Sequence, residues 1–400
     1  MSTQQHINWP RLIFWGISYV SLLGSSVISY GNPVEPNVVR GAAEFSNPAA
    51  GHLVIDQFTQ RAVIDWRSFN IDAGELTEFR MPSSDSVSLN RVSGTGQSLI
   101  DGRLTSNGNL FLLNPNGVII GKNSRIDVGG FVASSLDLDN DQFMAAGELS
   151  FHGDSKAPVI NLGQIGASHG DIILIAPQVT NEGSLIAPNG RVGLAAGNDV
   201  MLKVDGAERL FVRSSTSKGG VLNKGVIEAN IAELKAHDGN VYGMAIQNEG
   251  RINAKTLTKE GGKIYLRSGR GKISNTGRLE AKGGDVRIDA GPAGEVEVAG
   301  TLDTTSDTGR GGSITITGGK INLAADTLVI ADGLFGGGEI KIGGGMRGQD
   351  PNLQNALNLS VAEGATITAD ATLKGDGGNV ILFAEDTLAF GGRISADGGL

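Results

Sequence analysis

The sequence predicts an all-β chain that folds as a right-handed parallel β-helix, a solenoid in which each turn of the chain stacks on the previous one. Three observations predict this fold: a repeat of roughly 20 to 28 residues, short strands with alternating apolar residues, and abundant Gly, with 61 Gly in 400 residues. Only 5% of the residues are aromatic. Val, Ile, Leu and Ala therefore have to fill the core, which suits thin layers of stacked strands.

Two phrases alternate along the repeat. The first is Asn-x-Gly-x-Ile/Leu-x-Ala, found at residues 161–167, 181–187, 223–229, 248–254 and 275–281, with looser copies at 298–304, 362–368 and 390–396. The second is Gly-Gly-x-Val/Ile-x-Leu/Ile, found at residues 261–266, 283–288, 311–316, 337–342 and 377–382. The long step from Gly183 to Gly225 is interpreted as two periods. A period of this length indicates a solenoid and is too short for a β-propeller blade of about 40–45 residues.

Each second phrase is expected to form a strand with one buried face. In residues 283–290, Val286 and Ile288 point one way and the charged residues beside them point the other. We expect Gly-Gly and Asn-x-Gly to form turns, because Gly and Asn tolerate positive φ. Parallel pairing would then run along the axis at about 4.8 Å per coil. The repeated Asn is expected to form a ladder of side-chain amides between coils.

The N-terminus predicts a targeting segment. Residues 1–11 are polar and end at Arg11, and residues 12–30 are apolar with small residues towards the end. This pattern predicts a secretory signal peptide over residues 1–31. An uncleaved membrane anchor is the alternative, because nineteen residues are enough to span a bilayer.

Residues 32–150 contain longer phrases than the later repeats: VIDWRSFNI (63–71), FRMPSSDSVSLNRV (79–92), SLIDGRLTSNGNLFLLNPNGVIIG (98–121) and IDVGGFVASSLDLDNDQFMAA (126–146). In this order, the phrases closely resemble the N-terminal secretion domain of filamentous haemagglutinin-type two-partner secretion exoproteins. We therefore expect a secretion domain with a capping region over residues 32–200. Residues 201–400 are expected to form β-helix shaft repeats that are incomplete at the C-terminus.

The resemblance places a family motif on Asn114, Pro115, Asn116 and Gly117. Physically it is a turn signal between expected strands at 110–113 and 118–120, because Pro fixes φ while Asn and Gly accept left-handed conformations. Two interpretations stay open, a turn alone or a motif that the transporter recognises, and both can hold. Some family members carry a second motif, Asn-Pro-Asn-Leu, which is missing from residues 120–200.

A second, supporting motif precedes the first. It consists of Arg67, Ser68, Phe69 and Asn70, directly after Trp66. The two aromatic side chains are expected to plug the end of the β-helix rather than contact a partner.

The resemblance implies a route of export. A signal peptide would send the chain to the periplasm of a Gram-negative bacterium. Periplasmic recognition modules of a partner outer-membrane β-barrel transporter would bind the N-terminal domain, and the chain would fold outside the cell. The implied end use is adhesion or display on a filamentous shaft, with a ligand on a host or neighbouring cell.

No catalytic, metal or cofactor site is expected. The five His residues are scattered without metal-ligand spacing, and the absence of Cys excludes thiolate sites. The stretch from Asp137 to Glu148 is weakly similar to a calcium loop but has Gln142 where such a loop needs Gly, so we expect a solvated acidic loop. The net charge of -9, without a Lys/Arg block, argues against nucleic acid as a partner.

The alternative function is an extracellular carbohydrate-active enzyme, since many polysaccharide lyases are parallel β-helices. Such an enzyme needs carboxylates and a Lys or Arg that converge on one face over adjacent coils. The sequence shows no such cluster, and the fold alone does not decide between the two functions.

Overall fold

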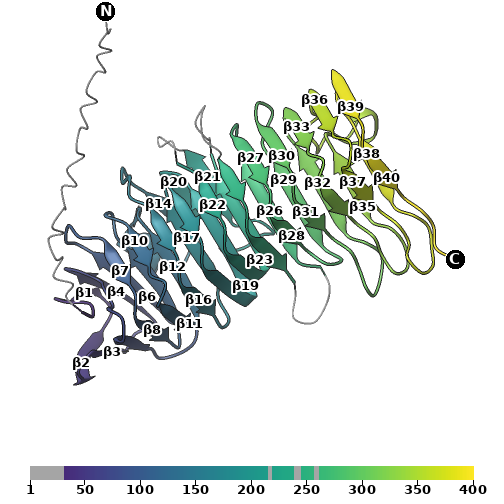
Figure 1. Ribbon diagram of the computed structural model, residues 1–400. Helices are drawn as coiled ribbons and strands as arrows, with labels where there is room; N and C mark the ends of the chain where they lie inside the picture. The colour runs from purple at the N-terminus through teal and green to yellow at the C-terminus, as the bar shows by residue number, and fades with distance from the viewer. Residues whose placement is uncertain (1–30, 215–218, 238–244, 256–260) are drawn as a thin grey trace, which may run out of the picture.

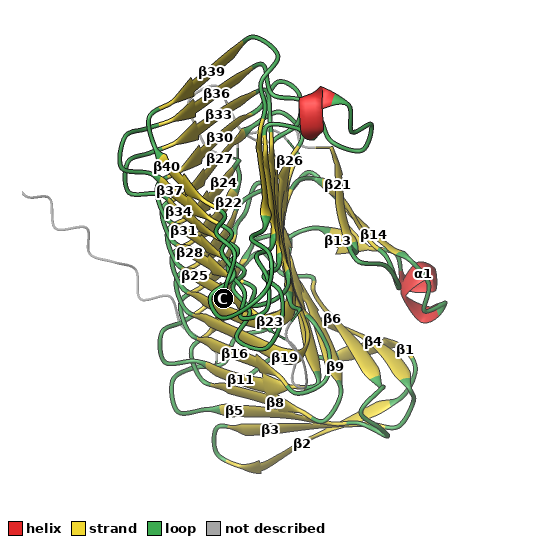
Figure 2. Cartoon of the chain, turned by 90° about the vertical axis from the view of Figure 1, so that its right-hand side faces the viewer, coloured by secondary structure: helices red, strands yellow, loops and turns green. Residues whose placement is uncertain are grey.

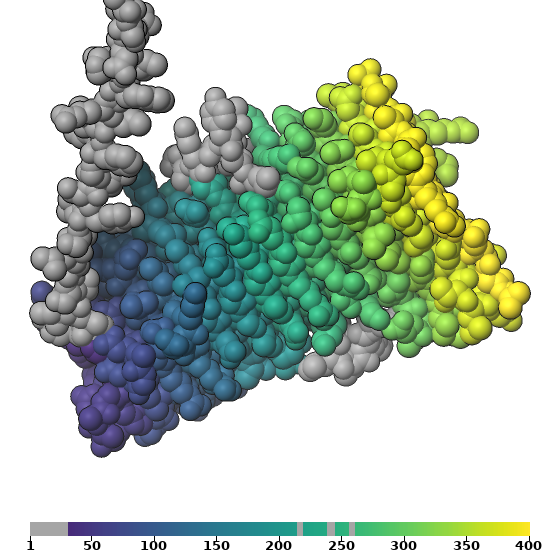
Figure 3. Space-filling model, in the orientation of Figure 1, coloured from purple at the N-terminus to yellow at the C-terminus, as the bar shows by residue number. Residues whose placement is uncertain are grey.

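A computed structural model describes residues 31–214, 219–237, 245–255 and 261–400. These residues form a right-handed parallel β-helix with about 2% helix, so the predicted fold is confirmed. Successive coils stack in chain order along one axis (Figure 1), and the space-filling view shows a continuous shaft from the first coils to the last (Figure 3). The predicted signal peptide lies almost wholly outside the described residues.

Antiparallel strands cover the N-terminal end of the shaft. Strand β1 (Asn37–Arg40) pairs with β4 (Arg61–Trp66), and β2 (Ala43–Ala49) pairs with β3 (His52–Gln57). Phe45 and Phe69 both meet the ring of the fully buried Trp66 edge-on, with ring centroids 5.5 and 5.6 Å away. The aromatic side chains near the supporting motif thus fill the end of the core.

The coils build three parallel faces, which we call A, B and C, and a complete coil contributes one strand to each. Face A begins with β3 and continues through β5 (Leu76–Arg80), β8 (Arg103–Ser106), β11 (Arg125–Val128), β16 (Gln164–Ala167), the first half of β19 (Ser184–Ala196), the first half of β23 (Val226–Ala236), β25 (Arg251–Ala254), β28 (Arg278–Glu280), β31 (Thr301–Asp303), β34 (Leu328–Ile330), β37 (Thr366–Thr368) and β40 (Arg393–Ser395).

Face B follows face A in every coil. It begins with β4 and continues through β6 (Val87–Val92), β9 (Asn109–Leu113), β12 (Gly130–Ser134), β17 (Ile172–Ala176), the second halves of β19 and β23, β26 (Lys263–Ser268), β29 (Asp285–Asp289), β32 (Ser313–Thr317), β35 (Glu339–Ile342) and β38 (Asn379–Leu382).

Face C closes each coil as an 11-stranded sheet. Its strands are β7 (Ser98–Ile100), β10 (Val118–Ile120), β15 (Val159–Asn161), β18 (Val179–Asn181), β22 (Val221–Asn223), β24 (Ile246–Asn248), β27 (Lys272–Asn275), β30 (Glu295–Val298), β33 (Lys320–Leu323), β36 (Asn358–Val361) and β39 (Thr387–Phe390). The predicted strand at 118–120 is β10 itself, and the one at 110–113 is β9 with one more residue.

The predicted Asn ladder is confirmed on face C. Its members are fully buried and lie one coil apart, and each side-chain amide donates to the next at 2.7 or 2.8 Å: Asn161, Asn181, Asn223, Asn248 and Asn275. The ladder satisfies polar groups inside the core, where an unpaired amide would be costly.

The glycines of the first phrase serve a different purpose from the one predicted. Gly183, Gly225 and Gly250 do not take positive φ. A Cβ on any of them would instead lie 2.0 to 2.2 Å from the carbonyl oxygen of the equivalent glycine one coil earlier. Close stacking of backbone on backbone, rather than turn geometry, therefore requires Gly at these positions.

The interpretation of the long step from Gly183 to Gly225 as two periods is wrong. Val179 pairs directly with Val221, so the step is a single coil with an insertion at the corner between faces B and C. The inserted residues form β20 (Asp199–Leu202) and β21 (Leu210–Ser214). A repeat count by spacing cannot distinguish a missing copy from an inserted hairpin, since both lengthen the gap.

The inserted hairpin joins a second insertion at the same corner. Strands β13 (Asp137–Leu138) and β14 (Leu149–His152), with the short helix α1 (Asn140–Met144), complete a four-stranded antiparallel sheet in the order β13-β14-β20-β21. This sheet lies against the outer side of face B (Figure 2). A second apolar core fills the space between them, with Phe111, Phe143, Phe151 and Ile173 among its members.

Candidate functional site

The predicted motif forms a β-turn that leads from face B into face C. The Gly117 amide donates to the Asn114 carbonyl at 2.9 Å, which closes the turn. The buried Asn114 side chain accepts from the Asn116 amide at 2.9 Å and donates to the Gly96 carbonyl and to Ser98 Oγ, both at 3.0 Å. Asn114 therefore fixes both its own turn and the neighbouring loop.

Gly117 has a positive φ of 100°, as the sequence suggests, whereas Asn116 does not. A Cβ on Gly117 would also lie 2.9 Å from the Pro158 carbonyl oxygen. Both the backbone conformation and the close contact thus require Gly. The Asn116 side chain reaches outwards along the loop and donates to the Gly94 carbonyl at 2.9 Å.

The supporting motif lies beside this turn through the same loop. The Gly94 amide donates to the Arg67 carbonyl at 3.1 Å, and the Leu99 amide donates to Asn70 Oδ1 at 2.9 Å. Phe69 is buried, with 2% of its surface exposed. The structure therefore brings the two motifs together, although they are more than forty residues apart in the sequence.

A surface groove of about 1440 Å³ lies where these segments meet. The segment that begins at Val34 forms one wall, and the loop of residues 93–97 forms another. Residues of the supporting motif and of face C also line it: Arg67, Ser68, Asn70, Leu99 and Ile119. The turn at 114–117 does not line the groove itself, but Asn114 and Asn116 hold the 93–97 loop through the carbonyls of Gly96 and Gly94. The sequence reasoning missed the 93–97 loop, whose Ser-Gly-Thr-Gly-Gln composition marked it only as a connection.

Burial distinguishes residues of the two motifs and of the segments beside them. Asn114, Phe69 and Gly117 are buried and hold the local fold. Arg67, Gln97, Leu99 and Pro115 are exposed, and we call these four residues the rim. Five other residues that line the groove are also exposed and share with the rim the surface that a partner could contact: Glu35, Asn37, Ser93, Thr95 and Gly96.

No group of three or more His, Cys, Asp or Glu side chains in the described ranges could hold a metal ion. The Asp137–Asp141 stretch is held by protein contacts: Asp137 pairs with Arg91 at 2.9 Å, and Asp139 caps helix α1. In the part of the chain that the structure describes, no helix is long and apolar enough to cross a membrane.

A parallel β-helix of this kind is the architecture of the secretion domains of secreted bacterial exoproteins. The sequence matches the TPS secretion domain over residues 34–281, and the chain therefore belongs to the two-partner secretion family. The resemblance to filamentous haemagglutinin-type exoproteins is confirmed. Members of this family are secreted by Gram-negative bacteria.

Solved and curated relatives agree with this assignment. The secretion domain of HMW1 from Haemophilus influenzae superposes with a TM-score of 0.70 at 28% identity, covering 92% of this chain and 91% of that one. Two heme/hemopexin-binding proteins from Haemophilus influenzae are 29% and 28% identical to it over 312 and 348 residues. These matches cover 74% and 80% of this chain but only 33% and 37% of the relatives, so the chain spans about a third of their length.

Proposed function

We propose that the rim and the groove beside it form the surface by which a partner outer-membrane β-barrel transporter recognises this chain. The observation that supports the proposal is that the supporting motif lines this groove at the start of the β-helix, while the turn at 114–117 holds the loop of residues 93–97 that forms its other wall. Of the residues in these motifs, Asn114 and Phe69 are internal, so the contacts would fall to Arg67, Pro115 and their exposed neighbours.

The fold suits the proposed route of export. Each coil makes its parallel hydrogen bonds mainly with the coils before and after it, so that folding can spread along the shaft as the chain emerges. Every added coil buries further apolar residues, which opposes movement back through the transporter. The chain would leave through the periplasm and the outer membrane and reach the medium or the cell surface.

Rim variants test the recognition surface. The triple variant Arg67→Ala/Gln97→Ala/Leu99→Ser should reduce secretion into the medium about tenfold or more, while its melting temperature stays unchanged. The matched control Arg251→Ala/Gln247→Ala/Leu328→Ser changes three outward-facing shaft residues and should be secreted normally. Normal secretion of the rim variant would refute the proposal. Asn114→Ala cannot serve as the main test, because its side chain also holds the loop.

The end use that we propose is adhesion or display on a filamentous shaft. The names of the curated relatives support a second candidate, binding of heme or hemopexin by the secreted protein. The two can be separated by incubating the secreted protein with immobilised hemopexin and, in parallel, with cultured host cells. Retention on hemopexin without cell attachment would favour the second candidate, and the reverse result would favour adhesion.

A further inference from the structure

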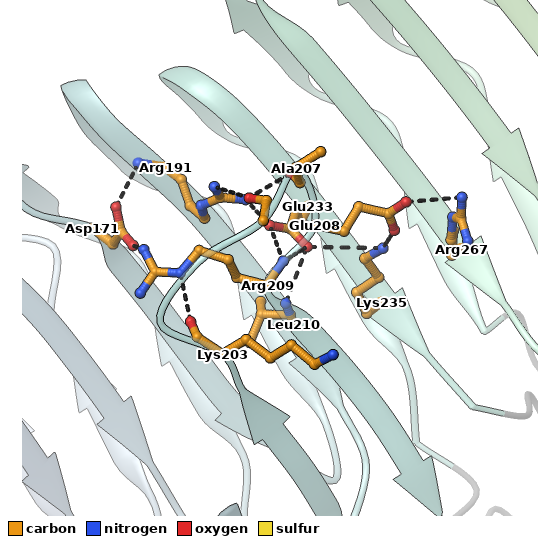
Figure 4. A network of polar contacts seen from close by, with 11 residues as sticks. Asp171, Arg191, Lys203, Ala207, Glu208, Arg209, Leu210, Glu233, Lys235 and Arg267 are labelled. Atoms are coloured by element: carbon orange, nitrogen blue, oxygen red, sulfur yellow. Dashed lines mark hydrogen bonds and ion pairs between the residues drawn. The ribbon is translucent and has the colours of Figure 1, made fainter. Parts of the chain in front are cut away.

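The tip of the β20–β21 hairpin, residues 203–209, is held to face B by a network of buried charges (Figure 4). Glu233 is at its centre and is fully buried. It pairs with the Arg191 guanidinium, and its carboxylate accepts from the backbone amides of Arg209 and Leu210 at 3.0 to 3.2 Å. The carboxylate therefore binds the shaft and the hairpin at once.

Further contacts extend the network on both sides. The Arg191 guanidinium also donates to the carbonyls of Gly206 and Ala207 at 3.1 and 3.0 Å. The Arg209 guanidinium pairs with Asp171 at 2.6 Å. These bonds involve three residues of the hairpin tip, so the tip cannot leave without exposing several charged partners.

The other arm of the network runs through Glu208. Its carboxylate pairs with Lys235, which is 5% exposed, and with Arg267 at 2.8 Å. Burial lowers the pKa of Lys235, and the Glu208 carboxylate opposes that shift. The ammonium group also lies 3.8 Å from the Glu233 carboxylate, so the hairpin supplies the closer of its two charge partners.

The shaft residues of this network come from four consecutive coils. Asp171 precedes β17, Arg191 belongs to β19, Glu233 and Lys235 belong to β23, and Arg267 belongs to β26. These strands are neighbours on face B. The hairpin precedes β23 and β26 in the chain. Two of the four strands that its tip contacts would therefore leave the transporter after the hairpin itself.

Burying a charge without a partner is strongly unfavourable, whereas the paired charges can be buried together. Among the contacts of the Arg191 guanidinium within the described chain, Glu233 is the one that supplies a negative charge. Conversely, Glu233 lies on the outer side of face B and needs the hairpin tip to satisfy it. The hairpin tip and the charged residues of face B therefore need each other as partners before either can be buried.

We propose that this network is a latch, which closes the hairpin tip over face B only after the coils of β23 and β26 have stacked. The N-terminal folding unit would then extend through β26, rather than end near residue 200, which falls inside β20. The family match, which runs to residue 281, includes all residues of the latch.

Pulsed hydrogen exchange during refolding of the 400-residue chain tests the order of events. The amides of Arg209 and Leu210 should gain protection together with, or after, the amides of residues 232–236. The amides of residues 173–176 on β17 serve as the early reference. Protection of Arg209 and Leu210 while β23 still exchanges freely would overturn the proposal.

Glu233→Gln tests the latch in the folded protein. It should accelerate exchange of the amides in residues 203–210 about tenfold or more, while β13 and β14 change little. Glu297→Gln, which breaks an ion pair with Lys272 on the outer side of face C, is the matched control and should leave the hairpin unchanged. Equal exchange in both variants would overturn the proposal. If Glu233→Gln does not fold, the refolding order in the unaltered chain decides.

Discussion

Asn181 and Asn223 lie 42 residues apart in the chain, yet their side chains share a 2.7 Å hydrogen bond in one continuous ladder. The other steps of the ladder span 20, 25 and 27 residues. The chain leaves the stack after Ala196 and returns at Val221 in the same register. The ladder thus identifies which residues stack on one another, whereas the number of residues in a coil does not.

Asn223→Ala should lower the free energy of unfolding by about 2–4 kcal/mol, because two buried hydrogen bonds are lost and the amides of Asn181 and Asn248 lose a partner. Urea unfolding followed by circular dichroism would measure the change. Asn322→Ala removes a half-buried amide from the outer side of face C and should change stability far less. Equal losses in the two variants would contradict a special role for the ladder.

Gly250→Ala should destabilise the shaft by about 1–3 kcal/mol, because its Cβ would lie 2.2 Å from the Gly225 carbonyl oxygen and force neighbouring coils apart. Gly147→Ala is the control, since a Cβ there meets no atom within 4 Å. Thermal unfolding of the two variants checks the prediction. A Gly250 variant as stable as the Gly147 variant would show that the coils can separate easily.

Phe143→Ala should destabilise the second core by about 3–5 kcal/mol, since its fully buried ring packs edge-on against Phe111 at 5.5 Å. Its ring also lies 4.5 Å from the Arg61 guanidinium. Hydrogen exchange should rise first in α1 and β14, ahead of the shaft. Phe335→Ala, at an exposed ring, is the control. A uniform increase along the shaft would mean that the antiparallel sheet does not unfold separately.

Glu78 on β5 should make the first coils of the shaft sensitive to acid. The hydrogen bonds from Arg80, at 2.9 and 3.0 Å, lower the pKa of Glu78, with a smaller contribution from His52. A carboxylate with a lowered pKa stabilises the folded state fully above its unfolded value of about 4.3, and this contribution disappears as the pH falls through the folded value.

The stability difference between the unaltered chain and Glu78→Gln should therefore be present at neutral pH and shrink as the pH is lowered below 4. Melting temperatures from pH 7 down to pH 2 would show it. Arg80→Ala should give the same pH dependence, because it removes the cause of the shift. A difference that stays constant to pH 2 would exclude the Glu78 carboxylate as its source.

The repeat and its alternation were sufficient to predict the solenoid, because each strand pairs with its equivalent one coil away and the local pattern recurs. The Asn ladder followed from the same periodicity. The antiparallel sheet could not be predicted in this way. Its pairing of Leu149 with Leu202 joins two insertions that share no repeat. One signal was present, since residues 172–176 form a continuous apolar run, which indicates a strand buried on both sides.

The candidate site was predictable in part. The turn at 114–117 follows from Pro and Gly, and the sequence placed the flanking strands correctly. Its partners could not be found, because Asn114 contacts Gly96 and Ser98 across a coil, and the sequence alone does not give the register of that contact. The division of the motif into buried and exposed residues likewise depends on the tertiary fold.

The corner between faces B and C accepts insertions of very different kinds. Residues 135–158 and 197–214 leave the shaft there, and so do residues 343–357, which include the short 3-10 helix Met346–Gly348. In each case the strand of face C resumes in register. Foreign epitopes or binding loops grafted at this corner should therefore be tolerated in several coils at once. Spaced at multiples of about 4.8 Å, they would form a regular array along one edge, a ready scaffold for multivalent display.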